Sequence, residues 1–187
     1  MTFNSLLSNF SILLSLILSI SYLFLKKKNS PLIFISFLWI LAGLLQFQLY
    51  LIYTKELLNY PEAFIVFFPT TLLIGPFFYF YFESKSSTTF KLKGYQLFHF
   101  LPSILSLVIF REFIFGFRDE KIQTLHSLYN GLHMFGYLTL SILTCLSTLS
   151  YIIYITKQQR YVAEFKSLFS RNLFYLFAFI NLTLPLM

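Results

Sequence analysis

The chain contains few charged residues, and long stretches contain none. Only 11% of its 187 residues are charged, whereas 57% are hydrophobic. No Asp, Glu, Lys or Arg occurs within residues 1–25, 29–54, 63–82, 94–110, 122–156 or 172–187. A helix needs roughly 20 apolar residues to cross the hydrocarbon core of a bilayer. A soluble domain of this length cannot bury so many apolar segments, so we interpret the chain as an integral membrane protein.

Residues that commonly perform chemistry are equally scarce. Cys145 is the only cysteine, which excludes a disulfide framework and a cysteine metal site. His126 and His133 share a helical face, but about 10 Å of helical rise separates them, so one ion cannot bind both. The sequence has no His-Glu-x-x-His, phosphate-binding loop, Gly-x-Ser-x-Gly or paired carboxylates within a span. We therefore expect no enzymatic activity, no metal and no cofactor.

The apolar segments predict an all-α fold, a polytopic transmembrane bundle of about six spans in one domain covering residues 1–187. The predicted spans cover about 5–25, 31–53, 61–82, 94–112, 124–156 and 172–187. The last range spans only about 24 Å at 1.5 Å per residue. We therefore expect the last span to be truncated.

The basic residues predict the orientation of these spans. With the N-terminus outside, ten basic residues lie in the inner loops: Lys26, Lys27, Lys28, Lys85, Lys91, Lys93, Lys157, Arg160, Lys166 and Arg171. Four lie in the outer segments: Lys55, Arg111, Arg118 and Lys121. This excess follows the positive-inside rule and indicates a multi-pass protein of the bacterial cytoplasmic membrane. It also accounts for the net charge of +7 without a nucleic-acid partner.

Several polar residues lie inside the predicted spans. Ser11, Ser15 and Ser19 recur every four residues. This stripe either lets a second helix approach closely or bonds to the carbonyls one turn earlier. Gln46 and His133 need partners in lipid, so each either faces a cavity or bonds to a neighbouring helix. Prolines at 69 and 76 predict kinks in the third span.

Two stretches resemble a known family. Residues 73–81, Leu-Ile-Gly-Pro-Phe-Phe-Tyr-Phe-Tyr, precede a polar loop and then residues 97–102, Leu-Phe-His-Phe-Leu-Pro. This arrangement resembles the multi-span N-terminal sensor of bacterial AraC-family transcriptional regulators, where Gly-Pro-x-x-Tyr-x-Tyr ends the third span and His-Phe-x-Pro begins the fourth. The residues Leu-His-Met at 132–134, Tyr137 and the basic run 157–160 are similar to the family's fifth span.

The resemblance implies a sensor of seven or eight spans followed by a cytoplasmic, DNA-reading double helix-turn-helix domain. This sequence has no helix-turn-helix pattern, so we expect a fragment, a truncated product or a lone sensor module, without direct nucleic-acid binding. The leading hypothesis is a sensory domain in which Gly75, Pro76, His99 and Pro102 frame the inner junction of the third and fourth spans. Alternatively, these four residues only shape a tight turn at the membrane surface. Beyond the lipid bilayer, the hypothesis leaves open an unknown small-molecule ligand and a homodimer.

Two other classes of protein stay open. A small transporter or accessory membrane subunit would use Gln46 and His133 to line a path, but the chain lacks internal repeats and buried acids. A membrane enzyme is the weakest hypothesis, because paired catalytic groups are missing. A histidine kinase behind a similar sensor is an alternative output.

Overall fold

The computed structural model describes residues 3–25, 30–87, 90–109, 111–130 and 134–157, and these form an all-α bundle. Its long helices are α1 (Phe3–Phe24), α2 (Ser30–Tyr53), α3 (Phe67–Ser86) and α7 (Met134–Lys157). Shorter helices are α4 (Leu101–Ile109), α5 (Arg111–Phe115) and α6 (Arg118–Tyr129). The 3-10 helices are η1 (Glu56–Leu58), η2 (Pro61–Val66) and η3 (Gly94–Phe100). His133 and the predicted span 172–187 lie outside the described residues.

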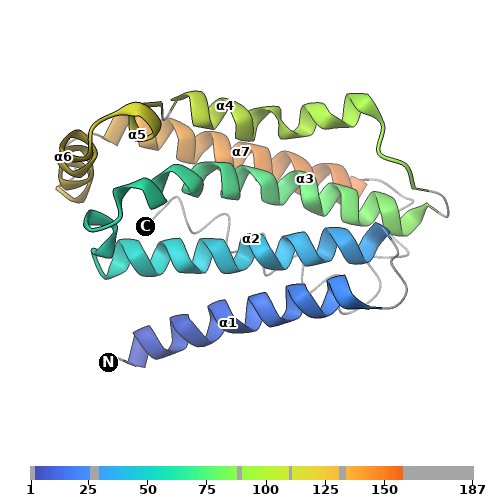
Figure 1. Ribbon diagram of the computed structural model, residues 1–187. Coiled ribbons are helices and arrows are strands. Elements are labelled where there is room, and N and C mark those ends of the chain that lie inside the picture. The colour runs from blue at the N-terminus through green and yellow to red at the C-terminus, as the bar shows by residue number, and fades with distance from the viewer. Residues whose placement is uncertain (1–2, 26–29, 88–89, 110, 131–133, 158–187) are drawn as a thin grey trace.

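Helix α3 is at the centre of the bundle. It contacts α2, α4 and α7, whereas α1 packs on the other side of α2 (Figure 1). Side chains from α2, α3 and α7 meet in the main core, where Leu38, Phe80, Phe82 and Ile155 are almost completely buried. A smaller cluster, Leu51, Leu57, Phe64 and Leu125, fills the end of the bundle where α6 lies. The two clusters fix the positions of the long helices around α3.

Small residues allow α1 to approach α2 closely. A β-carbon at Gly43 would lie 3.3 Å from the β-carbon of Ser15. Ser36 Oγ donates to the carbonyl of Ser19 at 2.8 Å, and the two hydroxyls lie 2.9 Å apart. Ser15 Oγ also donates to the carbonyl of Ser11 at 2.9 Å. The serine stripe therefore does both things that its spacing allows, packing against a neighbour and bonding to its own helix.

Helix α3 stays continuous through its prolines. Pro69 lies in the first turn, where an amide proton would have no partner within the helix. Pro76 lies inside the helix, so the carbonyl of Leu72 loses its usual amide donor. The predicted range 61–82 consists of two parts, because η2 covers Pro61–Val66 and the α-helix begins at Phe67.

The charged residues 118–121, which lie between the fourth and fifth predicted spans, are helical. They begin α6, which crosses the end of the bundle (Figure 1). Glu120 Oε2 accepts the backbone amide of Phe117 at 3.0 Å and caps this helix. The predicted span 124–156 therefore comprises the end of α6 and most of α7. Residues 94–112 are likewise divided, among η3, α4 and the start of α5.

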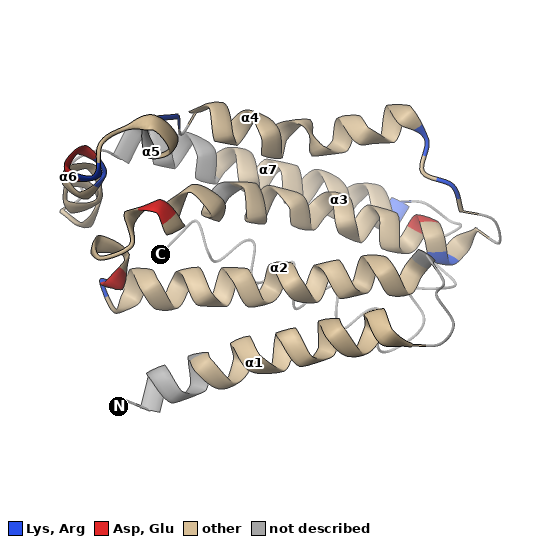
Figure 2. Ribbon diagram, in the orientation of Figure 1, with Lys and Arg blue, Asp and Glu red and all other residues tan. Residues whose placement is uncertain are grey.

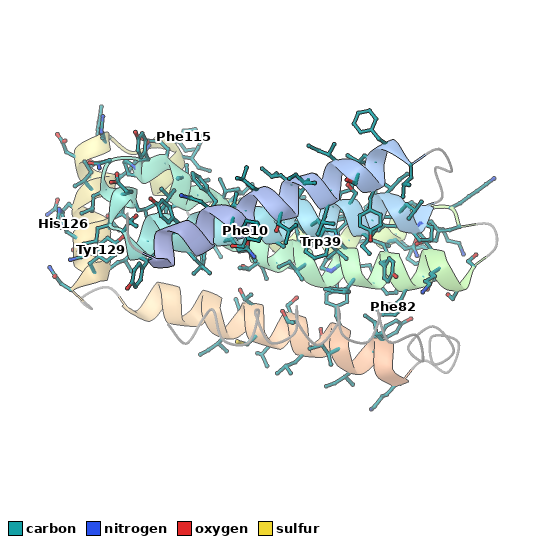
Figure 3. All side chains as sticks on the ribbon, turned by 90° about the horizontal axis from the view of Figure 1, so that it is seen from below. Phe10, Trp39, Phe82, Phe115, His126 and Tyr129 are labelled. Carbon is teal, nitrogen blue, oxygen red and sulfur yellow. The ribbon has the colours of Figure 1, made fainter. Side chains whose placement is uncertain are left out.

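Helix α6 is held to the connection between α2 and α3. Arg118 Nη2 donates to the carbonyl of Asn59 at 3.0 Å, and Lys121 Nζ lies 3.6 Å from Glu62 Oε1. Tyr129 Oη donates to the carbonyl of Ile52 at 3.1 Å. Figure 3 shows His126 and Tyr129 together at this end, far from Phe82 at the other end. We call residues 55–66, which include η1 and η2, together with α5 and α6 the end cap.

Two helical segments of the described chain, Pro31–Tyr53 and Pro61–Ser86, are long and apolar enough to cross a membrane. The core helix of a soluble protein passes the same test of length and composition. Shorter apolar helical segments cover Asn9–Phe24, Gly94–Ile109 and Ile142–Ile155. The fold class is therefore all-α. The length and composition of the helices do not by themselves place the protein in a membrane, so the charges and apolar residues on the surface of the bundle must be considered as well.

Replacing Ser15 by Leu should separate α1 from α2. Ser15 is buried at that contact, so the larger side chain should lower the free energy of unfolding by about 1–3 kcal/mol. Ser21→Leu on the exposed side of α1 is the matched control, with an expected change within about 0.5 kcal/mol. Unfolding in detergent, followed by circular dichroism, measures both variants. Equal stability of the two variants would contradict the close contact.

Candidate functional site at the junction of α3, η3 and α7

The aromatic ring of Tyr151 on α7 lies directly on the backbone of α3 at Gly75. A β-carbon at position 75 would lie 2.9 Å from Cε2 of Tyr151 and closer still to Cδ2. Real β-carbons essentially never approach another heavy atom so closely. Only glycine at this position therefore leaves room for the ring. Gly75 is the ninth residue of the 20-residue α3, so the contact is near the middle of the helix.

The hydroxyl of the same tyrosine reaches a third element. Tyr151 Oη lies 2.7 Å from Nδ1 of His99, which belongs to η3. Tyr151 therefore holds α7 against α3 through its ring and against η3 through its hydroxyl. A short hydrogen bond between partly buried groups is stronger here than in water, because the surroundings have a lower dielectric constant. We call Gly75, His99 and Tyr151 the latch.

Aromatic side chains surround the latch. The ring centroid of Tyr79 lies 4.9 Å from that of His99 and 6.4 Å from that of Tyr151. Tyr154 presents an edge to Tyr79 at 5.6 Å, and Phe80 does the same to His99 at 5.9 Å. Tilted and edge-to-face pairs at these separations are favourable beyond the apolar area that they bury. The rings therefore limit the orientations available to the imidazole of His99.

Gln96 connects the latch to the start of η3. Its side chain is buried, and Nε2 donates to Tyr79 Oη at 3.4 Å. Its Oε1 accepts the backbone amide of Lys93 at 2.8 Å, which closes the first turn of η3. A displacement of the segment before η3 would therefore disturb the tyrosine that packs on His99.

Hydroxyl groups join α4 to α3 on the other side of η3. Ser103 Oγ donates to the carbonyl of Pro69 at 2.8 Å, and Ser106 Oγ donates to the carbonyl of Ser103 at 2.7 Å. Thr144 and Thr148 are buried on α7. Short hydroxyl side chains of this kind let helices approach closely while satisfying their polar atoms. They position η3 and α7 for the latch.

The structure brings together part of the predicted constellation. Gly75 and His99 both contact Tyr151, and Pro76 is buried in α3 beside Gly75. Pro102 is exposed in the first turn of α4, a position that favours proline. Pro102 therefore belongs to the start of a helix and not to the latch.

The predicted buried amide, Gln46, has a neighbour of the same kind. Gln48 is 4% exposed, and its Nε2 donates to the carbonyl of Ala63 at 3.5 Å. Among the residues that the structure describes, Oε1 of Gln46 and Oε1 of Gln48 are buried and have no hydrogen-bond partner. The two amides are two residues apart on α2, so they point to different sides of that helix.

The contacts of the latch hold α7 against α3 and η3. The described part of the chain contains no group of three His, Cys, Asp or Glu residues able to hold a metal ion. Tyr151 and His99 form a phenol–imidazole pair that a small movement of α7 can make or break. No family model, curated protein or solved structure matches this chain.

Sequence reasoning missed Tyr151, Tyr79 as a partner of His99, and Gln96. A tyrosine within an apolar helix resembles any interfacial tyrosine until its neighbours are known. The spacing of Gln96, three residues after Lys93, was a usable signal because glutamine at the third position commonly caps a helix start. No comparable sequence signal indicates the contact between Gly75 and Tyr151, which are 76 residues apart.

Replacing Gly75 by Leu should push the Tyr151 ring away from α3. The expected loss is about 1–3 kcal/mol in the free energy of unfolding, because the new side chain overpacks the contact. The same substitution should cost less in a Tyr151→Ala background, where the ring is gone. A double-mutant cycle in detergent, read by thermal unfolding, measures this coupling. Additive effects of the two substitutions would contradict the contact.

Proposed function

We propose that this bundle is a membrane-embedded sensory domain of a bacterial transcriptional regulator. The observation that supports the membrane location best is the separation of charge along the bundle. Figure 2 shows the Lys, Arg, Asp and Glu residues at its two ends, with the long helices between them free of charge. A charge at the centre of a bilayer is costly, so a membrane protein keeps its charges at the two water interfaces.

The sides of the bundle present large apolar residues between these ends. On α1 they include Leu13, Ile17 and Ile20, each more than half exposed. The corresponding residues on α4 and α7 are Ile104, Val108, Leu146 and Ile153. Soluble monomers rarely expose contiguous apolar patches of such extent. Contact with lipid acyl chains explains an apolar surface on several helices at once.

The charges also suggest an orientation. Lys85, Lys91, Lys93 and Lys157 lie at the end opposite the end cap, where Glu83 is the only described acid. At the end cap, four basic residues accompany five acidic ones: Lys55, Arg111, Arg118, Lys121, Glu56, Glu62, Glu112, Asp119 and Glu120. The basic end belongs in the cytoplasm by the positive-inside rule, which places the start of α1 and the end cap outside.

The two ends are connected by α7. This helix follows α6 of the end cap in the chain, and it carries Tyr151 to the latch with Gly75 and His99. A ligand that binds better to one position of the end cap would favour one position of α7. In the proposed mechanism the latch opens or closes with that movement and passes the change toward the cytoplasm. The resemblance to the sensor of AraC-family regulators is the reason for proposing a transcriptional output.

The second candidate is a small transporter or accessory membrane subunit. The buried oxygens of Gln46 and Gln48 favour it, because such groups can contact a polar solute passing through a bundle. Reconstitution into vesicles tests this candidate. Solute flux above that of empty vesicles would favour it over the sensor.

Reporter fusions should establish the orientation. A fluorescent protein that folds only in the cytoplasm should be active after residue 87, between α3 and η3. A periplasmic phosphatase should be active after residue 121, within the end cap. The opposite pattern would contradict the orientation. Release of the whole protein from membranes by alkaline carbonate would contradict the membrane location itself.

Replacing Tyr151 by Phe should alter signalling while keeping the fold. The change removes only the hydroxyl that pairs with His99, at a cost of about 1 kcal/mol. The matched control is Tyr154→Phe, since Tyr154 is 39% exposed on the same helix. The measurement is the set of messenger RNA levels in the source bacterium, compared among the wild type, a deletion strain and the two variants. We expect Tyr151→Phe to change these levels, toward or away from the pattern of the deletion strain. We expect Tyr154→Phe to leave them unchanged.

Equal amounts of membrane-bound protein must be confirmed for both variants. A deletion that leaves all transcripts unchanged would overturn the proposed function. A deletion that changes transcripts, with Tyr151→Phe indistinguishable from the wild type, would overturn the role of the latch.

A further inference from the structure

The segment 90–98, at the basic end, comprises the last part of the connection between α3 and η3 and the first five residues of η3, and it has an unusual surface. Four large apolar side chains in it are strongly exposed: Leu92 by 46%, Tyr95 by 63%, Leu97 by 53% and Phe98 by 72%. Lys91 and Lys93 are exposed among them. The segment therefore exposes hydrophobic and basic side chains that are close together in the chain, at one end of the bundle (Figure 2).

This segment is anchored to the bundle in spite of its exposure. Phe90 presents its edge to Phe34 of α2 at 5.5 Å. Gln96 points inward and binds both the amide of Lys93 and the hydroxyl of Tyr79. Phe90 and Gln96 thus hold the segment against α2 and α3, while the side chains of Leu92, Tyr95, Leu97 and Phe98 are left exposed.

The chemistry of the surface fits the headgroup region of a bilayer. Tyrosine favours the boundary between acyl chains and headgroups. Phenylalanine and leucine enter the same boundary on the apolar face of interfacial helices. Each lysine near an anionic membrane surface gains about 1 kcal/mol. Lys93 Nζ lies 5.9 Å from the ring centroid of Tyr95, so a cation and an aromatic face already adjoin each other. Lys85 and Lys157 add positive charge at the same end.

We propose that the 90–98 segment binds anionic phospholipid headgroups, of the phosphatidylglycerol type, at the cytoplasmic leaflet. The exposed aromatic and aliphatic side chains enter the interface, and Lys91 and Lys93 contact the phosphates. An acidic protein partner or a nucleic acid fits less well, because neither accounts for exposed apolar side chains alternating with lysines. This proposal rests on the membrane location given under the proposed function.

Lipid binding here would also reach the latch. Gln96 connects the amide of Lys93 to Tyr79, and the Tyr79 ring packs on His99. A lipid that holds the segment in place therefore holds η3 in the position that pairs His99 with Tyr151. The composition of the inner leaflet thereby sets how easily the latch opens.

A fluorophore at position 94 tests the proposal. Gly94 is suitable because a β-carbon there meets no atom within 4 Å. Gly94→Cys with Cys145→Ser leaves one thiol in the full chain for labelling with bimane. After reconstitution, quenching by phosphatidylglycerol with a doxyl label near its glycerol is compared with quenching by equally labelled phosphatidylcholine. We expect stronger quenching by phosphatidylglycerol than by phosphatidylcholine. The preference for phosphatidylglycerol should fall about fivefold with each lysine that is replaced, in Lys91→Gln and in Lys93→Gln.

Lys55→Gln is the matched control, since it removes one positive charge at the end cap and should leave the preference unchanged. Equal quenching by the two lipids would overturn the proposal, as would an equal effect of Lys55→Gln. Loss of the preference on adding millimolar glycerol phosphate would also overturn it, because the segment would then bind a free phosphate ester and not a lipid surface. Extraction with alkaline carbonate distinguishes failure of this proposal from failure of the proposed function. A protein that alkaline carbonate releases from the vesicles is not embedded in the membrane, whatever its preference between the two lipids.

Discussion

The contact between the Tyr151 ring and the backbone of α3 at Gly75 determines where α7 lies. Because position 75 has no side chain, an aromatic ring replaces the usual contact between two side chains and brings α7 close to α3. Only at that distance does the hydroxyl of Tyr151 reach Nδ1 of His99. Tyr79 of α3 packs against His99 at a tilt, and Gln96 donates to the hydroxyl of Tyr79, so the same region of α3 also contacts η3. The absence of a side chain at Gly75 thus allows the close contact of α7 with α3 and, through the Tyr151 hydroxyl, with η3.

Other contacts in the bundle use short polar side chains to the same effect. Ser19 and Ser36 join α1 to α2, and Ser103 joins α4 to the carbonyl of Pro69. In hydrocarbon, helices gain little from the hydrophobic effect when they associate, so close packing and such hydrogen bonds hold them together. At the end cap, longer side chains make an ionic contact between Lys121 and Glu62. This distribution agrees with a bundle that has an apolar surround and two polar ends.

The helical character of the chain was predictable from its apolar runs, and the stripe at Ser11, Ser15 and Ser19 indicated a packing face that the structure contains. The boundaries were harder to predict. Absence of charge alone does not show where a helix ends, so residues 124–156 were interpreted as one span although α6 and α7 divide them. The charged residues 118–121 separate two apolar runs in the sequence, yet they begin α6, with Glu120 capping its start. At the site, Gly75 and His99 could be identified, whereas their shared partner Tyr151 depends on packing between distant segments.

The latch also constrains the order in which the chain assembles. The ring of Tyr151 needs the bare surface of Gly75, and its hydroxyl needs His99, 52 residues earlier in the chain. Both partners emerge from the ribosome well before α7, so α3 and η3 can pack together first. Helix α7 then docks onto a surface that already exists. A chain whose synthesis has reached only α6 therefore holds His99 without its phenol partner, and the pair can form only once α7 is made.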